Sequence, residues 1–281
     1  MKRIAVLMTC YNRVQTTQEC LRRLFAQEVP IGYTFDVWLV DDASPDKTGE
    51  KVKEAFPQVN VIRGTGKLFW CKGMRLAWEK AAAAEDYDGY LWLNDDVMLN
   101  KNALCSLLND FADIKRVCEN GFAVVGTCSN AAESNILTYG CYDGKMAVLH
   151  PCGTPKEVSG EYMMSGNVVL VSKAAFKRIG FICDGYLHAY GDSDYRQLML
   201  KHSVPMYCSS LVVGICPKEF ARYHKPEDMR FLSRFKLLFD PKGKPIRDVF
   251  LYRRRFWGLS RAVVSVLHVT WITLFPNRKQ K

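Results

Sequence analysis

Three apolar segments in the first hundred residues are each followed by a cluster of polar residues. The segments are residues 4–9, 36–40 and 90–93, and continuous apolar runs of this length are typical of strands buried on both faces. The clusters lie at residues 9–13, 41–46 and 94–96. Ligands of parallel sheets bind outside the carboxyl ends of the strands, so the three clusters are expected to converge on one site.

The cluster Asn94-Asp95-Asp96 contains two adjacent carboxylates. Adjacent carboxylates repel each other and are tolerated where a cation neutralises them. Oxygen ligands suit Mg²⁺ or Mn²⁺, which can bridge to a diphosphate. A cap for a following helix explains the same residues, and the pattern leaves both interpretations open.

The cluster that begins at Asp41-Asp42 continues through Ser44, Pro45 and Asp46. A carboxylate here can accept a hydrogen bond from a nucleobase N–H or a ribose hydroxyl. A simple strand-to-helix turn is equally compatible, because Ser-Pro-Asp is good turn and cap chemistry.

A third candidate is Asp192, which follows Gly191 and the aromatic stretch 186–190. A carboxylate among aromatic side chains can have a raised pKa and act as a general base. The alternative is an N-cap for a helix over residues 193–202, and Asp194 is compatible with either role.

The elements that would position these residues alternate between strand and helix. Thr16 or Thr17 would cap a helix that ends at residue 27, and the later segments add further strands and helices. The expected strands are 59–63, 123–126 and 168–171, and the expected helices are 74–84, 102–114, 173–179 and 193–202. This order predicts an α/β fold with a mostly parallel central sheet flanked by helices.

The composition fits one large domain followed by a basic extension. The 281 residues are 48% hydrophobic, which is enough for a sizeable core. We expect a domain over residues 1–215, and the family resemblance described below implies a nucleotide-sugar-binding half at 1–100 and an acceptor half at 101–215. Residues 216–281 form a basic, aromatic-rich C-terminal extension.

The net charge of +10 is concentrated in that extension. A phosphate-rich partner or a solvated basic surface would explain it equally well. The apolar segment 262–275 is too short to span a bilayer, and arginines flank it. It is expected to be either a helix that lies on a membrane surface or a packed terminal element.

Eleven cysteines without a paired C-x-x-C motif, and an N-terminus without a signal peptide, predict reduced thiols and a cytoplasmic protein. A nucleic-acid partner is not expected, because the acidic strand ends would repel it.

The motifs together resemble the family 2 glycosyltransferases, which are inverting enzymes with the A-type glycosyltransferase fold. The resemblance covers roughly residues 3–208 and depends on the order of five segments. These are Thr9-Cys10-Tyr11-Asn12-Arg13, Val40 to Asp46, Leu93 to Val97, Met164 to Asn167, and Gly191-Asp192-Ser193-Asp194. The loop from Gly66 to Arg75 looks like the donor-contact loop of rhamnosyltransferase-like members.

The resemblance implies a role for each matching position. Asp192 would be the catalytic base, and Asp96 would bind the metal, Mn²⁺ or Mg²⁺, with His224 as a second candidate ligand. The donor and nucleotide side would comprise Thr9, Tyr11, Asn12, Arg13, Asp41, Asp42, Lys67, Trp70, Gly73, Arg75, Asn94 and Asp95. The acceptor side would comprise Ser165, Gly166, Asn167, Tyr190 and Asp194.

Three positions depart from the family pattern. Asn94 replaces an aspartate, Gly191 replaces the usual glutamate before the base, and Leu198 stands where an arginine is common. These changes affect metal affinity and acceptor placement rather than the fold.

The expected reaction is sugar transfer with inversion from a nucleoside-diphosphate sugar to a hydroxyl of a glycan or lipid-linked acceptor. Cell-surface polysaccharide synthesis at the inner face of the cell membrane would suit the basic C-terminus. A nucleotidyltransferase is the first rival, although it would carry a Gly-rich loop after the first strand. A non-catalytic binding module is the second, and Asn94 and Gly191 leave it open.

Overall fold

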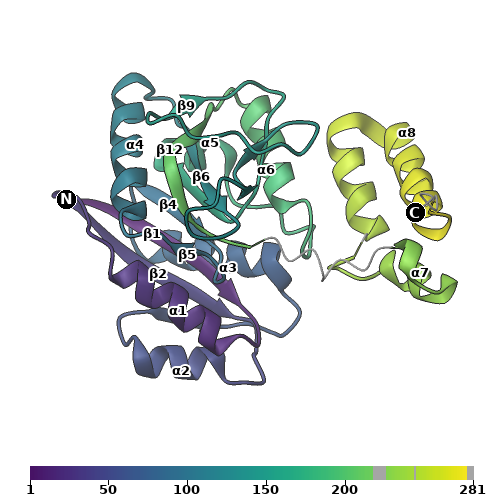
Figure 1. Cartoon of the computed structure of the whole chain (residues 1–281), viewed down its shortest axis with the longest axis horizontal. Helices are drawn as coiled ribbons and strands as arrows, with labels where there is room; N and C mark the ends of the chain where they lie inside the picture. The colour runs from purple at the N-terminus through teal and green to yellow at the C-terminus, as the bar shows by residue number, and fades with distance from the viewer. Residues whose placement is uncertain (218–225, 244, 277–281) are drawn as a thin grey trace.

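A computed structural model describes residues 1–217, 226–243 and 245–276. Its centre is a twisted sheet with the strand order β3-β2-β1-β4-β11-β6-β12-β5, covered by helices on both faces (Figure 1). A separate lobe from the C-terminal end of the chain lies beside this body.

The first half of the sheet is parallel. β1 (Lys2–Cys10) pairs with β2 (Tyr33–Asp41) and with β4 (Gly89–Leu93), and β3 (Asn60–Arg63) pairs with β2. The connections are the helices α1 (Val14–Phe25), α2 (Thr48–Ala55) and α3 (Phe69–Ala84). This arrangement brings the ends of β1, β2 and β4 to one edge, as the sequence predicts.

The second half of the sheet is mixed. β11 (Val168–Ser172) lies antiparallel between β4 and β6 (Ala123–Ser129), and β12 (Met206–Ile215) is parallel to β6. The short strands β5 (Met98–Leu99), β7 (Leu137–Tyr139) and β9 (Lys156–Glu157) pair with these longer ones. β8 (Cys141–Tyr142) and β10 (Met163–Met164) form a separate pair. The helices of this half are α4 (Ala103–Val117), α5 (Lys173–Ile179) and α6 (Gly191–Lys201).

Alternating side chains of β1 divide the core between the two faces of the sheet. Ile4, Val6 and Met8 pack with side chains of α1, α2 and α4. Ala5 and Leu7 point to the other face, where α3, α5 and α6 pack around Trp78 and Trp92. Both tryptophans are fully buried, so α3 and α6, the helix that contains Asp192, share one core.

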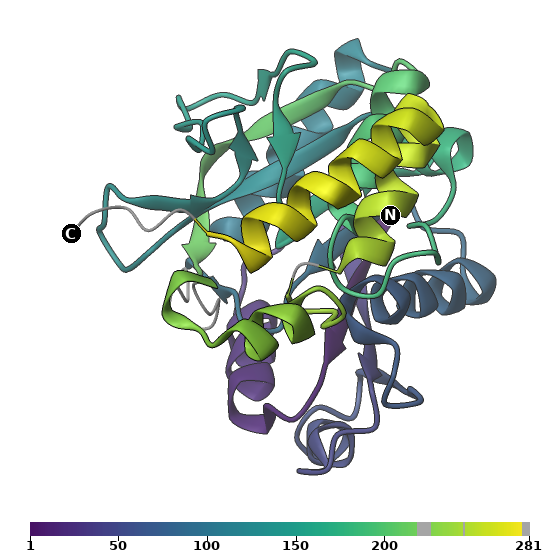
Figure 2. The same ribbon diagram turned by 90° about the vertical axis from the view of Figure 1, so that its right-hand side faces the viewer.

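The C-terminal extension is helical rather than irregular. A 3₁₀ turn η1 (Pro226–Asp228) precedes α7 (Phe231–Leu237), and α8 (Ile246–Leu274) follows. Gly258 has φ 86° and ψ 177°, so α8 consists of two arms, residues 246–257 and 259–274. The second arm lies on the outer side of the lobe (Figure 2).

The α/β fold with a helix-flanked sheet is confirmed, and two local predictions are wrong. α1 begins at Val14, so neither Thr16 nor Thr17 caps it, and Thr17 lies buried inside the helix. α6 begins at Gly191, so Asp192 lies in its first turn and no side chain caps its N-terminus.

Candidate active site

Arg13 links the loops after β1 and β4 at the carboxyl edge of the sheet. Its Nη1 lies 3.1 Å from Asp95 Oδ1 and 3.0 Å from Asp96 Oδ2. The backbone N–H of Asn12 donates to Ser44 Oγ at 2.9 Å, which joins the loop after β2 to the same group. The three polar clusters therefore converge.

Asp95 faces inward and anchors this edge. Its Oδ2 accepts a hydrogen bond from Thr17 Oγ1 at 2.9 Å, and 7% of its side chain is exposed. Burial raises the pKa of Asp95 to about 7, although the charge of Arg13 acts in the opposite direction. Asp95 thus holds α1 against the loop after β4 instead of reaching a ligand.

Asp96 is the exposed carboxylate of the pair, with 42% of its side chain accessible. Among the described residues, no group of three or more His, Cys, Asp or Glu side chains could hold a metal ion. Mg²⁺ in nucleotide sites is commonly bound by one or two carboxylates together with substrate phosphates. Asp96 fits that arrangement as a single protein ligand, with a donor diphosphate and water completing the shell. His224 lies outside the described residues.

Asp41 and Asp42 use their carboxylates to hold local backbone. Asp41 accepts hydrogen bonds from Ser44 and from the N–H of Gly49 at 3.1 Å, which fixes the start of α2. Asp42 accepts from the N–H groups of Gly66 at 2.7 Å, Leu68 at 2.8 Å and Phe69 at 3.1 Å. These three bonds fix the start of the predicted donor-contact loop, which we call the donor loop. Both carboxylates thus position local backbone, and their predicted direct contact with a nucleotide stays a prediction.

Trp70 connects the donor side with the acceptor side. Its Nε1–H donates to Asn94 Oδ1 at 2.7 Å. A Cβ atom on Gly166 would lie 2.7 Å from the Trp70 ring, and one on Gly191 would lie 3.0 Å from it. The backbone of Gly191, which precedes Asp192, and that of Gly166, which donates to its carboxylate, therefore pack directly against this indole.

The start of α3 also lies close to β1. A Cβ atom on Gly73 would lie 2.3 Å from Thr9 Oγ1. Only glycine at position 73 lets the helix that carries Trp70 approach the end of β1 so closely. Thr9 and Gly73 thus set the position of the donor loop.

Asp192 is half-buried at the start of α6. Its Oδ2 accepts from the N–H of Gly166 at 3.2 Å, and its Oδ1 accepts from the N–H of Ser193 at 2.7 Å. Burial raises the pKa of Asp192 above its ordinary value, while these two amides lower it in part. A carboxylate that neutral amides hold in place, with a raised pKa, is suited to accept a proton.

The other predicted acceptor-side residues are chain neighbours of Gly166, which donates to Asp192, and of Gly191, which precedes it. Ser165 Oγ accepts from the Gly140 N–H at 2.8 Å, and the Asn167 carbonyl accepts from the Asn94 N–H at 2.9 Å. Tyr190 has φ 68°, an unusual conformation for an aromatic residue, and its ring lies 4.9 Å from that of Tyr252 in α8. The strained backbone at Tyr190 turns the chain into α6.

Asp194 is fully buried behind the site. Tyr186 Oη donates to its Oδ2 at 3.0 Å, and Arg255 Nε lies 3.2 Å from the same atom. Burial raises the pKa of Asp194, and Arg255 and Tyr186 lower it in part. The predicted acceptor contact is therefore corrected, since Asp194 ties α6 to α8.

The remaining predicted donor-side residues separate into two groups. Tyr11, Asn12 and Lys67 are exposed at the carboxyl edge and free to meet a ligand there. Arg75 points away, with Nε 2.7 Å from Glu79 Oε1 and Nη1 donating to the Ile182 carbonyl at 2.8 Å. The prediction that Arg75 contacts the sugar donor is corrected, because its guanidinium is bound to Glu79 and Ile182 instead.

Three residues near the site were not predicted. Thr17 supports Asp95, Arg255 pairs with Asp194, and the Cys216 thiol lies 3.8 Å from Asp96 Oδ1. Each lies far in sequence from its partner, and no local pattern marks such pairs.

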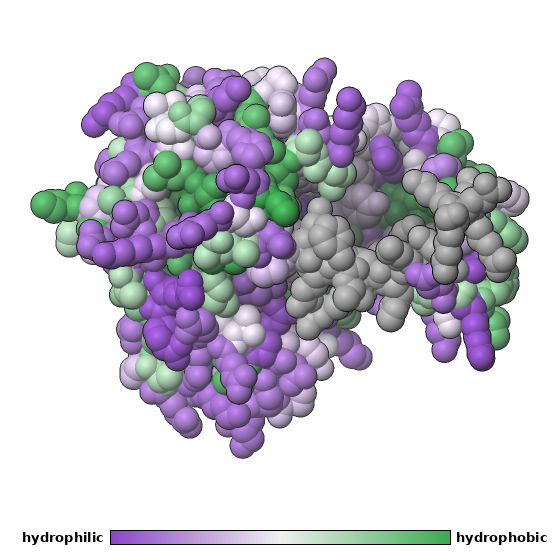
Figure 3. Space-filling view, in the orientation of Figure 1, coloured by the Kyte–Doolittle hydropathy of each residue, from purple (hydrophilic) through white to green (hydrophobic). Residues whose placement is uncertain are grey.

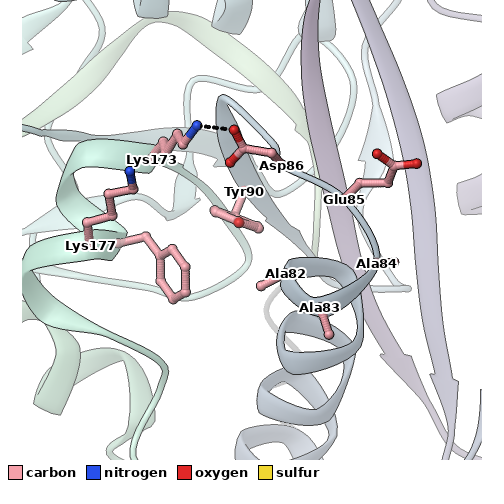
Figure 4. Close-up of a pocket in the computed structure, with 9 residues that line it drawn as sticks. Ala82, Ala83, Ala84, Glu85, Asp86, Tyr90, Lys173 and Lys177 are labelled. Atoms are coloured by element: carbon pink, nitrogen blue, oxygen red, sulfur yellow. Dashed lines mark hydrogen bonds and ion pairs between the residues drawn. The ribbon is translucent and has the colours of Figure 1, made fainter.

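A cavity of about 390 Å³ lies at the opposite end of β4 and is separate from this site (Figure 4). Glu85, Asp86, Tyr90, Lys173 and Lys177 are among its lining residues, and Lys173 Nζ lies 2.5 Å from Asp86 Oδ2. It lies near the amino end of β4, away from the strand ends that carry the candidate chemistry.

Comparison with known proteins agrees with this geometry. Residues 5–138 match the profile described as glycosyl transferase family 2. The structure of Staphylococcus aureus TarS is similar with a TM-score of 0.56 at 15% identity, and the match covers 96% of this chain and 44% of TarS. This chain thus spans less than half the length of that protein. No curated protein matches the sequence.

Two solved complexes share the fold. TarS residues 1–349 with UDP-GlcNAc match with a TM-score of 0.58 at 16% identity, over 98% of this chain and 82% of that one. The mannosyltransferase PcManGT from Pyrobaculum calidifontis, with GDP-Man and Mn²⁺, matches with a TM-score of 0.55 at 16% identity, over 95% and 74%.

The helix-flanked sheet has the A-type glycosyltransferase fold of these solved structures, so the predicted fold is confirmed. Residues 5–138 match the family 2 glycosyltransferases, so the predicted family is confirmed over that part of the chain. A glycosyl-transfer role is the function that the family and the fold support.

Proposed function

We propose that this protein is an inverting glycosyltransferase that moves a sugar from a nucleoside-diphosphate sugar to a hydroxyl of a glycan or lipid-linked acceptor. The observation that carries the proposal is the position of Asp192. Its half-buried carboxylate has backbone amides as partners and lies beside Trp70, which is hydrogen-bonded to Asn94 on the donor side.

In the proposed reaction the acceptor oxygen attacks the anomeric carbon from the face opposite the diphosphate. The bond from that oxygen to the anomeric carbon forms as the bond to the diphosphate oxygen breaks, and Asp192 takes the acceptor proton. Direct displacement inverts the anomeric configuration. Asp96 would hold Mn²⁺ or Mg²⁺, which when bound neutralises charge on the leaving diphosphate.

Trp70 and the donor loop would form one wall for the sugar. Asp42 fixes that loop through three backbone amides, so the loop is preorganised before the donor arrives. Asn94 keeps an amide NH₂ group to offer to a ribose hydroxyl, because its Oδ1 already accepts from Trp70.

The acceptor and the location belong to the same proposal. PcManGT and TarS were solved with GDP-Man and UDP-GlcNAc respectively, so a hexosyl or deoxyhexosyl donor is proposed for this chain. We place the enzyme in the cytoplasm, at the inner face of the cell membrane, in the synthesis of a cell-surface polysaccharide. The basic, aromatic C-terminal lobe supports that location.

The test is release of nucleoside diphosphate from a panel of UDP-, GDP- and dTDP-sugars, with Mn²⁺, with Mg²⁺ and with a chelator. Metal-dependent release from one donor, abolished in Asp96→Ala, is expected. Asp192→Ala should abolish transfer to an acceptor, and Asp113→Asn, a change at an exposed carboxylate on α4, is the matched control.

Retention of the anomeric configuration in the product would refute the displacement mechanism. Absence of both donor cleavage and nucleotide binding would refute the enzyme assignment and favour a glycan-binding module.

A further inference from the structure

The second arm of α8 exposes apolar side chains where a helix of a water-soluble protein carries polar ones. Leu267 and Trp271 are each 64% exposed, whereas Ala262 and Thr273 are fully buried. With 100° between successive residues, the two exposed side chains point away from the two buried ones. The side of this arm that faces outward is therefore apolar.

The apolar side continues onto α7. The Phe231 ring lies 6.2 Å from that of Phe275, which lies 4.7 Å from Trp271. Arg234 Nη1 donates to the Leu274 carbonyl at 3.0 Å and fixes the two helices together. We call this continuous surface the apolar face; its members are Phe231, Leu232, Phe235, Phe239, Leu259, Val263, Val264, Leu267, Trp271 and Phe275, all exposed.

Charge identifies the occupant of the apolar face. Residues 226–276 contain ten Lys or Arg and four Asp or Glu, which accounts for six of the ten net positive charges of the chain. Arg230, Lys236, Arg254 and Arg261 are exposed around the apolar residues, and hydrophilic and hydrophobic groups alternate on this lobe (Figure 3). A second copy of the chain would bring two such basic rims together, whereas an anionic lipid surface complements them.

The geometry favours a helix that lies in the membrane plane. α8 as a whole is long and apolar enough to cross a membrane. However, the break at Gly258 leaves an arm of residues 259–274, which is about 24 Å long, while the hydrocarbon core of a bilayer is about 30 Å thick. Its inner side is also occupied by protein contacts, as the buried Ala262 and Thr273 show.

We propose that the apolar face binds the anionic surface of a lipid bilayer, with α7 and the second arm of α8 lying among the headgroups. The proposal deepens the membrane location proposed above by naming the binding surface and the lipid charge, and it does not depend on glycosyl transfer. The apolar side chains enter the boundary between headgroups and acyl chains, and the arginines and lysines contact lipid phosphates.

The first arm of α8 connects this surface to the proposed base. Arg247 Nη1 donates to the Gly185 carbonyl at 2.8 Å, the Tyr252 ring packs at a tilt against that of Tyr190, and Arg255 pairs with Asp194. A groove of about 270 Å³ between the two arms of α8 reaches Tyr190 and is lined in part by Arg253 and His268. A bilayer bound to the lobe would therefore lie on the acceptor side of Asp192.

The test is co-flotation of the full chain with phosphatidylcholine vesicles, with and without phosphatidylglycerol. Binding is expected for the anionic vesicles and should weaken as salt increases. The double variant Leu267→Glu/Trp271→Glu should weaken binding at least about tenfold, because charges replace the central apolar side chains. Ile31→Glu, at an apolar residue that is fully exposed on the main body, is the matched control and should bind like the wild type.

A second variant separates charge from apolar contact. Arg254→Ser/Arg261→Ser should weaken binding and reduce its salt dependence, with no change in circular dichroism or melting temperature. Donor cleavage measured without vesicles should be unchanged in both double variants, so failure of the membrane proposal and failure of the proposed reaction are distinguishable.

Three results would overturn the proposal. The first is a wild-type chain that does not float with anionic vesicles. The second is a dimer by light scattering that Leu267→Glu/Trp271→Glu converts to monomer, since a second copy would then cover the apolar face. The third is retention in membranes after an alkaline carbonate wash, which would indicate a spanning helix.

Discussion

The contact between Gly166 and Trp70 gives a prediction whose size can be worked from the structure. In Gly166→Ala the new Cβ would lie 2.7 Å from Cη2 and Cζ2 of Trp70. The indole cannot retreat freely, because its Nε1–H is bound to Asn94 and its edge faces Trp92. We expect a loss of about 1–3 kcal/mol in the free energy of unfolding, the usual range for overpacking.

The same geometry predicts which second substitution relieves the clash. Trp70→Phe removes Cη2 and Cζ2, the two atoms that the new methyl group would meet. In the Trp70→Phe background, Gly166→Ala should therefore cost less than about 0.5 kcal/mol. The coupling between the two substitutions would then be about 0.5–3 kcal/mol, the range found for residues in direct contact.

The measurement is equilibrium unfolding in urea for the wild type, both single variants and the double variant. Gly144→Ala is the control, because a Cβ there meets nothing within 4 Å, and it should leave the unfolding free energy within about 0.5 kcal/mol. Equal costs of Gly166→Ala with and without the indole would refute the claim that Trp70 packs on the backbone of Gly166, whose N–H donates to Asp192.

Three further predictions concern ionisable groups. Asp192→Asn should lower the rate of transfer about 10²–10⁴-fold. The wild-type rate should fall as the pH is lowered, with an apparent pKa above that of an ordinary aspartate. Arg255→Met should cost about 1–3 kcal/mol of unfolding free energy at pH 7, because the buried Asp194 loses its cationic partner and keeps only the Tyr186 hydroxyl. The loss should shrink as acid protonates that carboxyl. Asp95 has a pKa of about 7 in the folded chain, whereas in the unfolded chain it loses its proton near pH 4. The melting temperature should therefore fall as the pH is raised from 4 to 7, and Asp95→Asn should reduce this dependence on pH.

The sequence predicted the parallel half of the sheet and the convergence of its polar ends because both depend on local patterns. Apolar runs mark β1, β2 and β4, and the polar residues follow each run directly. Asp96 and Asp192 could be found in the same way, since each begins a loop or helix immediately after a recognisable element. The direction of β11 was not predictable, because strand direction depends on pairing partners far along the chain.

The roles of the buried carboxylates could not be read from the sequence. Asp41, Asp42 and Asp95 follow strands in the same manner as Asp96, yet only the fold shows that backbone amides, a hydroxyl or Arg13 occupy their oxygens. A buried carboxylate must be satisfied by hydrogen bonds or an ion pair, and its partners lie up to 82 residues away in this chain. Burial thus separates a carboxylate that binds a ligand from one that supports the loop around it.

Asn94 and Gly191, two of the positions at which the chain departs from the family pattern, share Trp70 as a neighbour. Asn94 Oδ1 accepts from its Nε1 at 2.7 Å, and a Cβ on Gly191 would lie 3.0 Å from its ring and 2.6 Å from Cys71 Sγ. A glutamate before the base would therefore collide with the Trp70-Cys71 pair. An aspartate at position 94 would add a third carboxylate where Arg13 already pairs with both Asp95 and Asp96. Both departures are thus explained by the position of the Trp70 indole. Because Asp96 and Asp192 are still present, these departures favour an altered donor pocket over a loss of catalysis.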